Sequence, residues 1–292
     1  MRTGKLLLRG VIAVALGVGL ALPAPPAASA AASGAASAAA SGAEAGAASA
    51  RAQVAEGVDY GKLIDILLAA AEMGRDGVYT PQEINQLIQQ VIGAVNGTRV
   101  DLLARLNSQL THEIQAKTEA AVTKVELLQV PWAAGPALNS THDAAYAAKV
   151  HLQTVRDDDD ALDAVGRAMI TLFTMLETAY LMVDADDGTN LAATQRPYFR
   201  QGLEYLIQAM TPDCVDGGVP NAGLYTYTCS YGGKTVRGTY WEGTDTFRID
   251  DDPPLPGPFN RQLVADVLMY DTAQRLAKRA LQVLIDRGVG LP

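Results

Sequence analysis

Apolar residues recur every three or four positions from residue 55 to residue 210, the spacing that places them on one face of an α-helix. The pattern predicts a first helix from Tyr60 to Met73. A second helix begins after Thr80, because Thr80 to Glu83 combines a capping box with a proline at the first helical position. We expect Asn96-Gly97 to end this second helix.

Four further helices follow from the same periodicity. Residues 99 to 130 contain neither proline nor glycine and predict one helix of about 30 residues, roughly 45 Å long. Ser140 or Thr141 is expected to cap the alanine-rich helix that comes next. Apolar seams from 162 to 183 and from 199 to 210 predict two more helices.

The last predicted helix extends from about Phe259 to Asp286. Its spacing turns Leu263, Val267 and Tyr270 inward, together with apolar residues further along. Six or seven helices with apolar seams and short connections are typical of a helical bundle.

The segment 211 to 257 has the alternating pattern of β-strands instead. Residues 224 to 231 alternate, Gly232-Gly233 turns the chain, and residues 234 to 241 alternate back. A two-residue turn pairs Tyr231 with Lys234 and Cys229 with Val236, which places the tyrosines on one face and the threonines with Trp241 on the other. We expect the tyrosine face to pack on the bundle and the threonine face to contact water. A third strand is expected over Thr246 to Ile249.

Cys214 and Cys229 are the two cysteines of the chain. In an exported protein they are expected to form a disulfide, which closes a loop of about 15 residues. The predicted fold is therefore mainly α: a bundle of six to seven helices with a small disulfide-tied β-hairpin insertion before the last helix.

The first 30 residues have the composition of a secretory signal peptide. Arg2, Lys5 and Arg9 precede an apolar run of about 12 residues, and Ala28-Ser29-Ala30 provides a small-residue cleavage site. Residues 31–54 are almost entirely Ala, Gly and Ser, and are interpreted as a disordered spacer. Residues 55–292 form the predicted single helical domain, with the hairpin insertion at 211–257. We expect the mature protein to be secreted and extracellular.

Charge excludes one class of partner. The chain carries 23 Lys and Arg against 32 Asp and Glu, a net charge of −9. Removal of the predicted signal peptide, which has three basic and no acidic residues, changes the net charge to −12. Because nucleic-acid binding needs a basic surface, we expect no nucleic-acid partner. After signal removal we also expect no stable membrane span.

Acidic clusters at 157–160, at Asp184, Asp186 and Asp187, and at 250–252 are the most visible polar feature. Carboxylates are ligands for Ca²⁺, so Asp184, Asp186 and Asp187 are candidate metal ligands, with helix-start and loop charge as the alternative. Residues 76 to 83 resemble the second half of an EF-hand calcium loop, while Glu72 and Gly74 stand where that family places Asp or Asn. A turn followed by a capped helix also accounts for this segment. We expect no cofactor, or Ca²⁺ bound weakly.

Catalytic motifs find little support. Ser140 lies close in sequence to His142 and Asp143, but three residues on one helical turn cannot form the relay of a catalytic triad. His112, His142 and His151 form no His-x-x-x-His pair that would bind zinc on a helix. We therefore predict no catalytic residues and expect the chain not to be an enzyme.

Six aromatic residues gather between positions 225 and 247, which makes the hairpin the best candidate recognition surface. Tyr231, Arg237, Thr239 and Trp241 are the candidate binding residues. The first functional hypothesis is a non-catalytic binding or interaction protein for an unknown extracellular ligand or protein. Two alternatives stay open: a membrane-active, pore-forming-like helical protein, motivated by the apolar segment 161–183, and an extracellular hydrolase that uses carboxylates or a metal.

Overall fold

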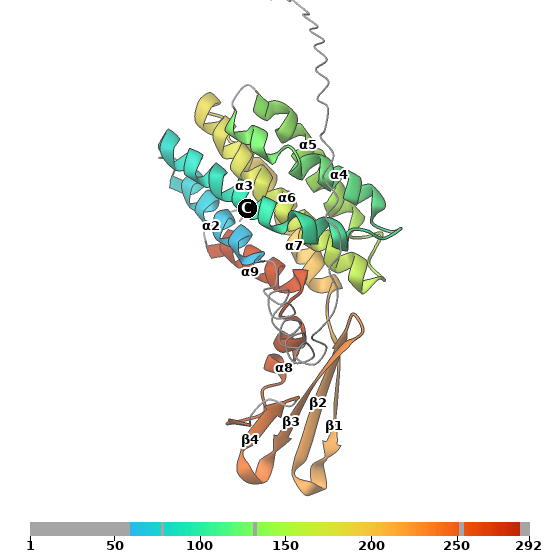
Figure 1. Ribbon diagram of the computed structural model, residues 1–292. Helices are drawn as coiled ribbons and strands as arrows, with labels where there is room; N and C mark the ends of the chain where they lie inside the picture. Colours follow the sequence, from blue (N-terminus) through green and yellow to red (C-terminus); the bar gives the residue numbers. More distant parts are fainter. Residues whose placement is uncertain (1–58, 77–78, 131–132, 251–253, 287–292) are drawn as a thin grey trace, which may run out of the picture. The chain divides into compact units, whose positions relative to one another are not determined.

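The computed structural model describes residues 59–76, 79–130, 133–250 and 254–286. The predicted signal peptide and spacer lie outside the described residues. Eight α-helices occupy the described part together with one antiparallel sheet, and the sheet lies between α7 and α8 in the chain (Figure 1). The predicted class, a mainly α bundle with a small disulfide-tied β insertion before the last helix, is confirmed, and the part predicted as that last helix is divided into α8 and α9. The helices are α2 (Gly61–Asp76), α3 (Pro81–Arg105), α4 (His112–Val122), α5 (Ala134–His151), α6 (Asp159–Asp187), α7 (Leu191–Ala209), α8 (Arg261–Leu268) and α9 (Ala273–Asp286).

Helix α6 is the centre of the bundle, and it packs against α2, α3, α4, α5, α7 and α9. Its predicted seam is fully buried at Leu162, Met169 and Leu176. Asp158 caps its N-terminus by accepting a hydrogen bond from Ala161 N, the role expected for acids at a helix start. Among the described helices α6 is long and apolar enough to cross a membrane, but 78% of its apolar window is buried in the bundle. Its apolarity is thus accounted for by the core.

Helix α3 begins as predicted and ends later than predicted. Thr80 and Glu83 form the capping box, and Pro81 is the first helical residue. The expected end at Asn96-Gly97 is wrong, because the helix continues to Arg105. A glycine inside a helix costs only about 1 kcal/mol, and burial of the residues that follow it outweighs that cost. The buried side chains beyond Gly97 are Thr98 and Leu102.

The predicted single helix over 99–130 is also wrong. The chain leaves α3 after Arg105, forms α4, and continues as the short 3₁₀ helix η1 (Val125–Gln129). At the break, Thr111 Oγ1 donates to the Leu106 carbonyl at 2.5 Å and lies 2.8 Å from Ser108 Oγ. Hydroxyl side chains that hydrogen-bond to nearby backbone groups compete with the helical hydrogen bonds of that backbone. The helix therefore breaks at this point without a proline or a glycine.

Helix α5 begins six residues before the predicted cap. Ala133 precedes its first turn, and Ser140 and Thr141 lie inside the helix, so the expected capping role of these two residues is wrong. Thr141 Oγ1 donates to the Ala137 carbonyl within the helix. Pro136 is tolerated because a backbone N–H in the first turn has no intrahelical partner to lose.

The predicted last helix is divided in two. Helix α8 ends at Leu268, a turn over residues 269–272 follows, and α9 begins at Ala273. Two residues that the periodicity turned inward therefore lie outside: Val267 is 40% exposed and Tyr270 is 66% exposed.

A buried arginine fixes this turn to the bundle. Arg167, in the middle of α6, is 2% exposed, and its Nε donates to Asp163 Oδ2 at 2.8 Å. Its Nη2 donates to the backbone carbonyl of Asp271 at 2.8 Å, and Asp163 Oδ1 accepts from Ala273 N at 2.6 Å. Although burial lowers the pKa of Arg167, the carboxylates of Asp163 and Asp271 hold that pKa above its usual value. The group stays charged, and it ties the start of α9 to α6.

The same network reaches α2 and α3. The ring of Tyr60 lies 4.9 Å from the guanidinium carbon of Arg167, and the Tyr60 hydroxyl donates to Asp101 Oδ2 at 2.9 Å. Arg105 binds the same Asp101 oxygen at 2.7 Å. Burial and the nearby Asp101 raise the pKa of Tyr60 above its ordinary value. Four helices therefore share one connected set of polar contacts.

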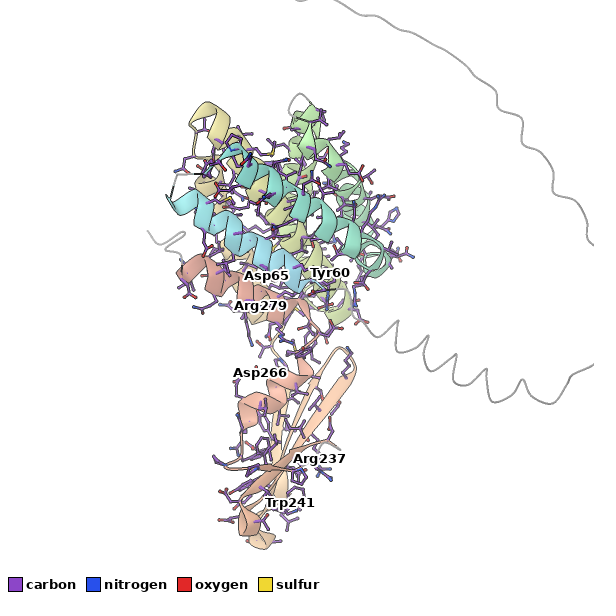
Figure 2. The ribbon with its side chains drawn as sticks, turned by 60° about the vertical axis from the view of Figure 1, so that its left-hand side comes forward. Tyr60, Asp65, Arg237, Trp241, Asp266 and Arg279 are labelled. Carbon is purple, nitrogen blue, oxygen red and sulfur yellow. A yellow bond between two sulfur atoms is a disulfide. The ribbon has the colours of Figure 1, made fainter. Side chains whose placement is uncertain are left out.

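Removing one carboxylate from this network should be costly. We predict that Asp163→Ala lowers the free energy of unfolding by about 3–5 kcal/mol, because Arg167 then stays buried without its closest partner. The matched control is Asp65→Ala, which breaks the Asp65–Arg279 pair at 3.5 Å, where the two side chains are 72% and 47% exposed (Figure 2). An exposed pair contributes less than about 1 kcal/mol. Equal losses in urea denaturation at pH 7 would contradict the structural role of Arg167.

Candidate functional site

The segment before α8 forms a five-stranded antiparallel sheet in the order β1-β2-β3-β4-β5. The predicted hairpin register is confirmed, from Tyr231 opposite Lys234 to Tyr225 opposite Tyr240. The expected third strand is β4. Strands β1 and β5 extend the sheet beyond the predicted hairpin. The strands are β1 (Asp213–Val219), β2 (Leu224–Tyr231), β3 (Lys234–Trp241), β4 (Thr246–Ile249) and β5 (Leu255–Pro256).

One face of the sheet is covered by α8 and the residues just before it. Phe259 stacks on Tyr240 with ring centres 5.7 Å apart and meets Tyr227 edge-on. Gly238 is required at the closest approach, since a Cβ there would lie 2.5 Å from Val264 Cγ2. The tyrosine face was expected to pack on the bundle. It packs mainly on α8, a separate short helix.

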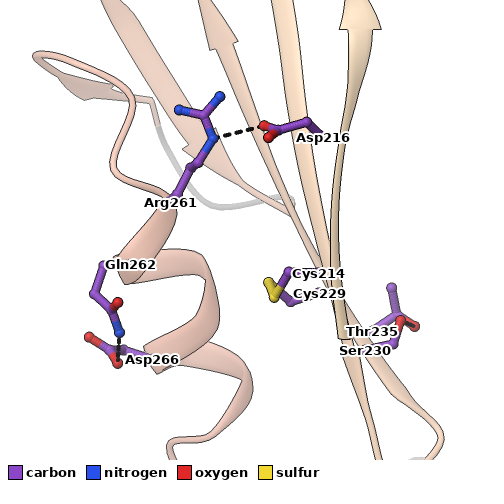
Figure 3. The surroundings of a disulfide bond; sticks show 8 residues. All are labelled: Cys214, Asp216, Cys229, Ser230, Thr235, Arg261, Gln262 and Asp266. Carbon is purple, nitrogen blue, oxygen red and sulfur yellow. Dashed lines mark hydrogen bonds and ion pairs between the residues drawn. A yellow bond between two sulfur atoms is a disulfide. The ribbon is translucent and has the colours of Figure 1, made fainter. Parts of the chain in front are cut away.

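The predicted disulfide joins β1 to β2. Cys214 and Cys229 are direct cross-strand partners, and their sulfur atoms are bonded on the face that α8 covers (Figure 3). Beside it, Arg261 of α8 binds Asp216 of β1 at 2.8 Å. Figure 3 also shows Ser230 and Thr235 on the side of the strands away from α8. The disulfide is the covalent contact on the covered face, and the Arg261–Asp216 pair, with side chains 51% and 62% exposed, adds little to it.

The opposite face carries a different set of side chains. Because cross-strand partners share a face, Thr239 lies between Thr226 of β2 and Arg248 of β4. Val215 on β1 is 59% exposed, Arg237 is exposed, and Trp241 is partly exposed. We call this surface the open face and define it by six residues. They are Val215, Thr228, Arg237, Thr239, Trp241 and Arg248.

Trp241 and two arginines dominate the open face. The guanidinium carbon of Arg248 lies 5.8 Å from the ring centre of Trp241, within the range of a cation–π contact. Arg248 Nε is buried without a hydrogen-bond partner among the described residues. No carboxylate of the described part of the chain forms an ion pair with the side chain of Arg237 or Arg248. Arg237 and Trp241 are labelled in Figure 2.

Comparison of the chain with protein-family models, with curated proteins and with solved structures gives no match. The side chains of the open face are therefore interpreted from their geometry alone. They combine an aromatic surface, two guanidinium groups and several hydroxyls on a rigid sheet. Such a set can bind a ligand, but it contains no nucleophile next to a base.

Three of the four predicted binding residues lie together. Arg237, Thr239 and Trp241 alternate along β3 on the open face, whereas Tyr231 is on the covered face. The Tyr231 hydroxyl donates to the backbone carbonyl of Asp159 at 3.5 Å, and Gly232 N donates to the Asp159 carboxylate. Burial raises the pKa of Tyr231 above its ordinary value. Tyr231 therefore anchors the hairpin to the start of α6.

Sequence reasoning missed Arg248. Part of the signal was available, because the third strand was predicted and Arg248 lies within it. The pairing of Thr239 with Arg248 places Arg248 on the same face as Thr239 and Trp241. What the sequence could not provide was the register between β3 and β4, which depends on the turn over 242–245.

Two of the acidic clusters each supply one helix cap, Asp158 at the start of α6 and Asp184 at the start of α7. Asp184 Oδ1 accepts from Leu191 N and from the Thr189 hydroxyl, both at 2.7 Å, and Oδ2 accepts from Ala192 N at 3.0 Å. These bonds cap the start of α7 and engage both carboxylate oxygens of Asp184, one of the candidate metal ligands. The side chains of Asp186 and Asp187 lie outside the described residues. Within the described part, no group of three His, Cys, Asp or Glu side chains could hold a metal ion.

The residues considered for catalysis are used elsewhere. Ser140 Oγ accepts from Lys124 Nζ at 2.7 Å, while its helix occupies the surrounding backbone N–H groups. His142 stacks on Tyr146, and His151 Nε2 is 2.6 Å from the Leu110 carbonyl.

The disulfide should matter for the sheet that carries the open face. We predict that the Cys214→Ala/Cys229→Ala double variant loses about 3 kcal/mol of unfolding free energy, as expected for a loop of this length. Reduction of the wild-type protein should give the same loss, and urea denaturation measures both. Unchanged midpoints would show that the covalent link adds nothing to the sheet.

Proposed function

We propose that the chain is an exported, non-catalytic binding protein whose open face contacts an extracellular polysaccharide. The observation that carries the proposal is the asymmetry of the sheet. One face is packed under α8, while the other leaves Trp241, Arg237 and Arg248 without a covering helix among the described elements.

The side chains of the open face suit a sugar polymer. A sugar ring has an apolar side of C–H groups, which packs on an aromatic ring such as that of Trp241. Its rim of hydroxyls needs fixed donors and acceptors, and guanidinium and threonine side chains supply them. Arg237 and Thr239 follow one another on the same face of β3, so their polar groups lie in line with Trp241. This order matches an extended ligand better than a compact one.

Rigidity supports the proposal as well. The cross-strand disulfide and the packing of Phe259 hold the sheet from its covered side. A surface that is already ordered loses little side-chain and backbone entropy when a ligand binds. The predicted signal peptide would place this surface where cell-wall and extracellular polysaccharides occur.

The test is sedimentation of the mature protein with insoluble cellulose, chitin and peptidoglycan. We predict binding to at least one of them, and a loss of affinity of about tenfold or more in Trp241→Ala and in Arg237→Ala. Tyr198→Ala is the matched control, because Tyr198 is a 47% exposed aromatic residue on α7, away from the sheet.

Two results would contradict the proposal. One is the absence of sedimentation with all three polymers. The other is binding that neither Trp241→Ala nor Arg237→Ala weakens, since Arg237 is exposed and its loss should leave folding intact. A melting temperature close to that of the wild type must accompany each variant.

A further inference from the structure

An apolar surface lies along α8 and the turn that follows it, although the helical periodicity of its residues predicts that they are buried. Leu263, Val267 and Tyr270 follow one another at spacings of four and three, which is a typical core stripe. In the structure the adjacent face of α8, with Val264 and Leu268, is the one that is buried. Of the first stripe, Leu263 is partly buried against the core, while Val267 is 40% and Tyr270 is 66% exposed. We call these three residues the second apolar face.

This second face borders a cavity of about 370 Å³. Leu263, Val267, Met269 and Tyr270 form its apolar wall, and Asp266 of α8 with residues of the first two turns of α9 forms the rest. The cavity does not touch the open face of the sheet, because α8 packs on the other side of β2 and β3.

The α9 side of the cavity is cationic. The guanidinium carbon of Arg275 lies 3.6 Å from the ring centre of Tyr270, and Nη1 donates to the Tyr270 carbonyl at 3.3 Å. Lys278 follows one turn later and is exposed. Within the described part of the chain neither cation has an ion-pair partner. The acid on the wall, Asp266, accepts a hydrogen bond from Gln262 at the α8 side (Figure 3).

A buried acceptor beside the cavity is also left unused. Gln274 lines the cavity and is 4% exposed. Its amide nitrogen donates to the carbonyls of Ile207 and Met210, while its Oε1 has no hydrogen-bond partner among the described residues. Buried polar atoms are normally paired. Because Oε1 accepts hydrogen bonds, the group that completes it must be a donor such as a water molecule, and a ligand carboxylate cannot fill this role.

We infer that this cavity binds an amphipathic carboxylate, with its apolar body on the Leu263–Tyr270 wall and its carboxylate at Arg275 and Lys278. A guanidinium stacked on an aromatic ring leaves its edge free for a carboxylate, and charge-assisted bonds of this kind are the strongest polar contacts a site can offer. The apolar wall supplies affinity through burial, in proportion to the area covered. The site is independent of the proposed polysaccharide surface.

The probe for this site is decanoate, used below its critical micelle concentration and measured by calorimetric titration. Decyltrimethylammonium has the same chain with the opposite charge, and 1-decanol has the chain without a charge. We expect decanoate to bind clearly more tightly than either. Lys278→Gln should weaken decanoate binding by about three- to tenfold, and Val267→Glu should abolish it, since it places a carboxylate on the apolar wall.

Two control variants show whether decanoate binds at this cavity or elsewhere on the protein. Lys62→Gln removes one exposed charge on α2 and should leave decanoate binding unchanged. Trp241→Ala should also leave it unchanged, so a failure of the polysaccharide proposal would not affect this result.

Three results would overturn the inference. The first is the absence of decanoate binding to the wild type. The second is equal binding of decanoate and decyltrimethylammonium. The third is a dimer that Val267→Glu converts to a monomer without any decanoate binding, which would make this surface a contact between two copies of the chain.

Discussion

The buried guanidinium of Arg167 is the contact on which the rest of the structure depends. It lies in the central helix of the bundle, and its partners belong to α6 itself, to the turn before α9 and, through Tyr60, to α2. Charged groups in a protein interior are stable only when their partners are placed accurately. The network therefore fixes the turn over 269–272, and this turn fixes the direction of α8. Which face α8 covers depends on the strands, because Gly238 leaves room for Val264 and Tyr240 stacks on Phe259.

The two proposed binding surfaces arise from this geometry. The short helix α8 covers only one face of the sheet, so the other face is left without a helix among the described elements. The sheet in turn covers only one side of α8, so Val267 on another side stays exposed. Each leftover surface carries cations without a described acidic partner: Arg237 and Arg248 on the sheet, and Arg275 and Lys278 at the cavity. In a chain of net charge −9, such local positive groups are a marked departure from the average.

Local chemistry could be predicted from the sequence. The capping box at Thr80, the Gly232-Gly233 turn with its register, the disulfide and the seam of α6 all depend on residues close together in the chain. The helix ends at Arg105 and Leu268 could not be predicted. Leu268 is followed by no proline or glycine, and the break depends on Arg167, about a hundred residues away. Of the candidate binding residues, alternation already places Arg237, Thr239 and Trp241 on one face and Tyr231 on the other, whereas the structure was needed to add Arg248.

The exposure of both surfaces in the native protein is the claim on which both proposals rest, and hydroxyl-radical footprinting of the mature protein tests it without knowledge of any ligand. We predict rapid oxidation at Trp241 and Tyr270, after correction for intrinsic reactivity, while the fully buried Phe173 and Phe199 stay protected. Protection of Trp241 and Tyr270 to the level of Phe173 would show that both surfaces are covered and would contradict this claim.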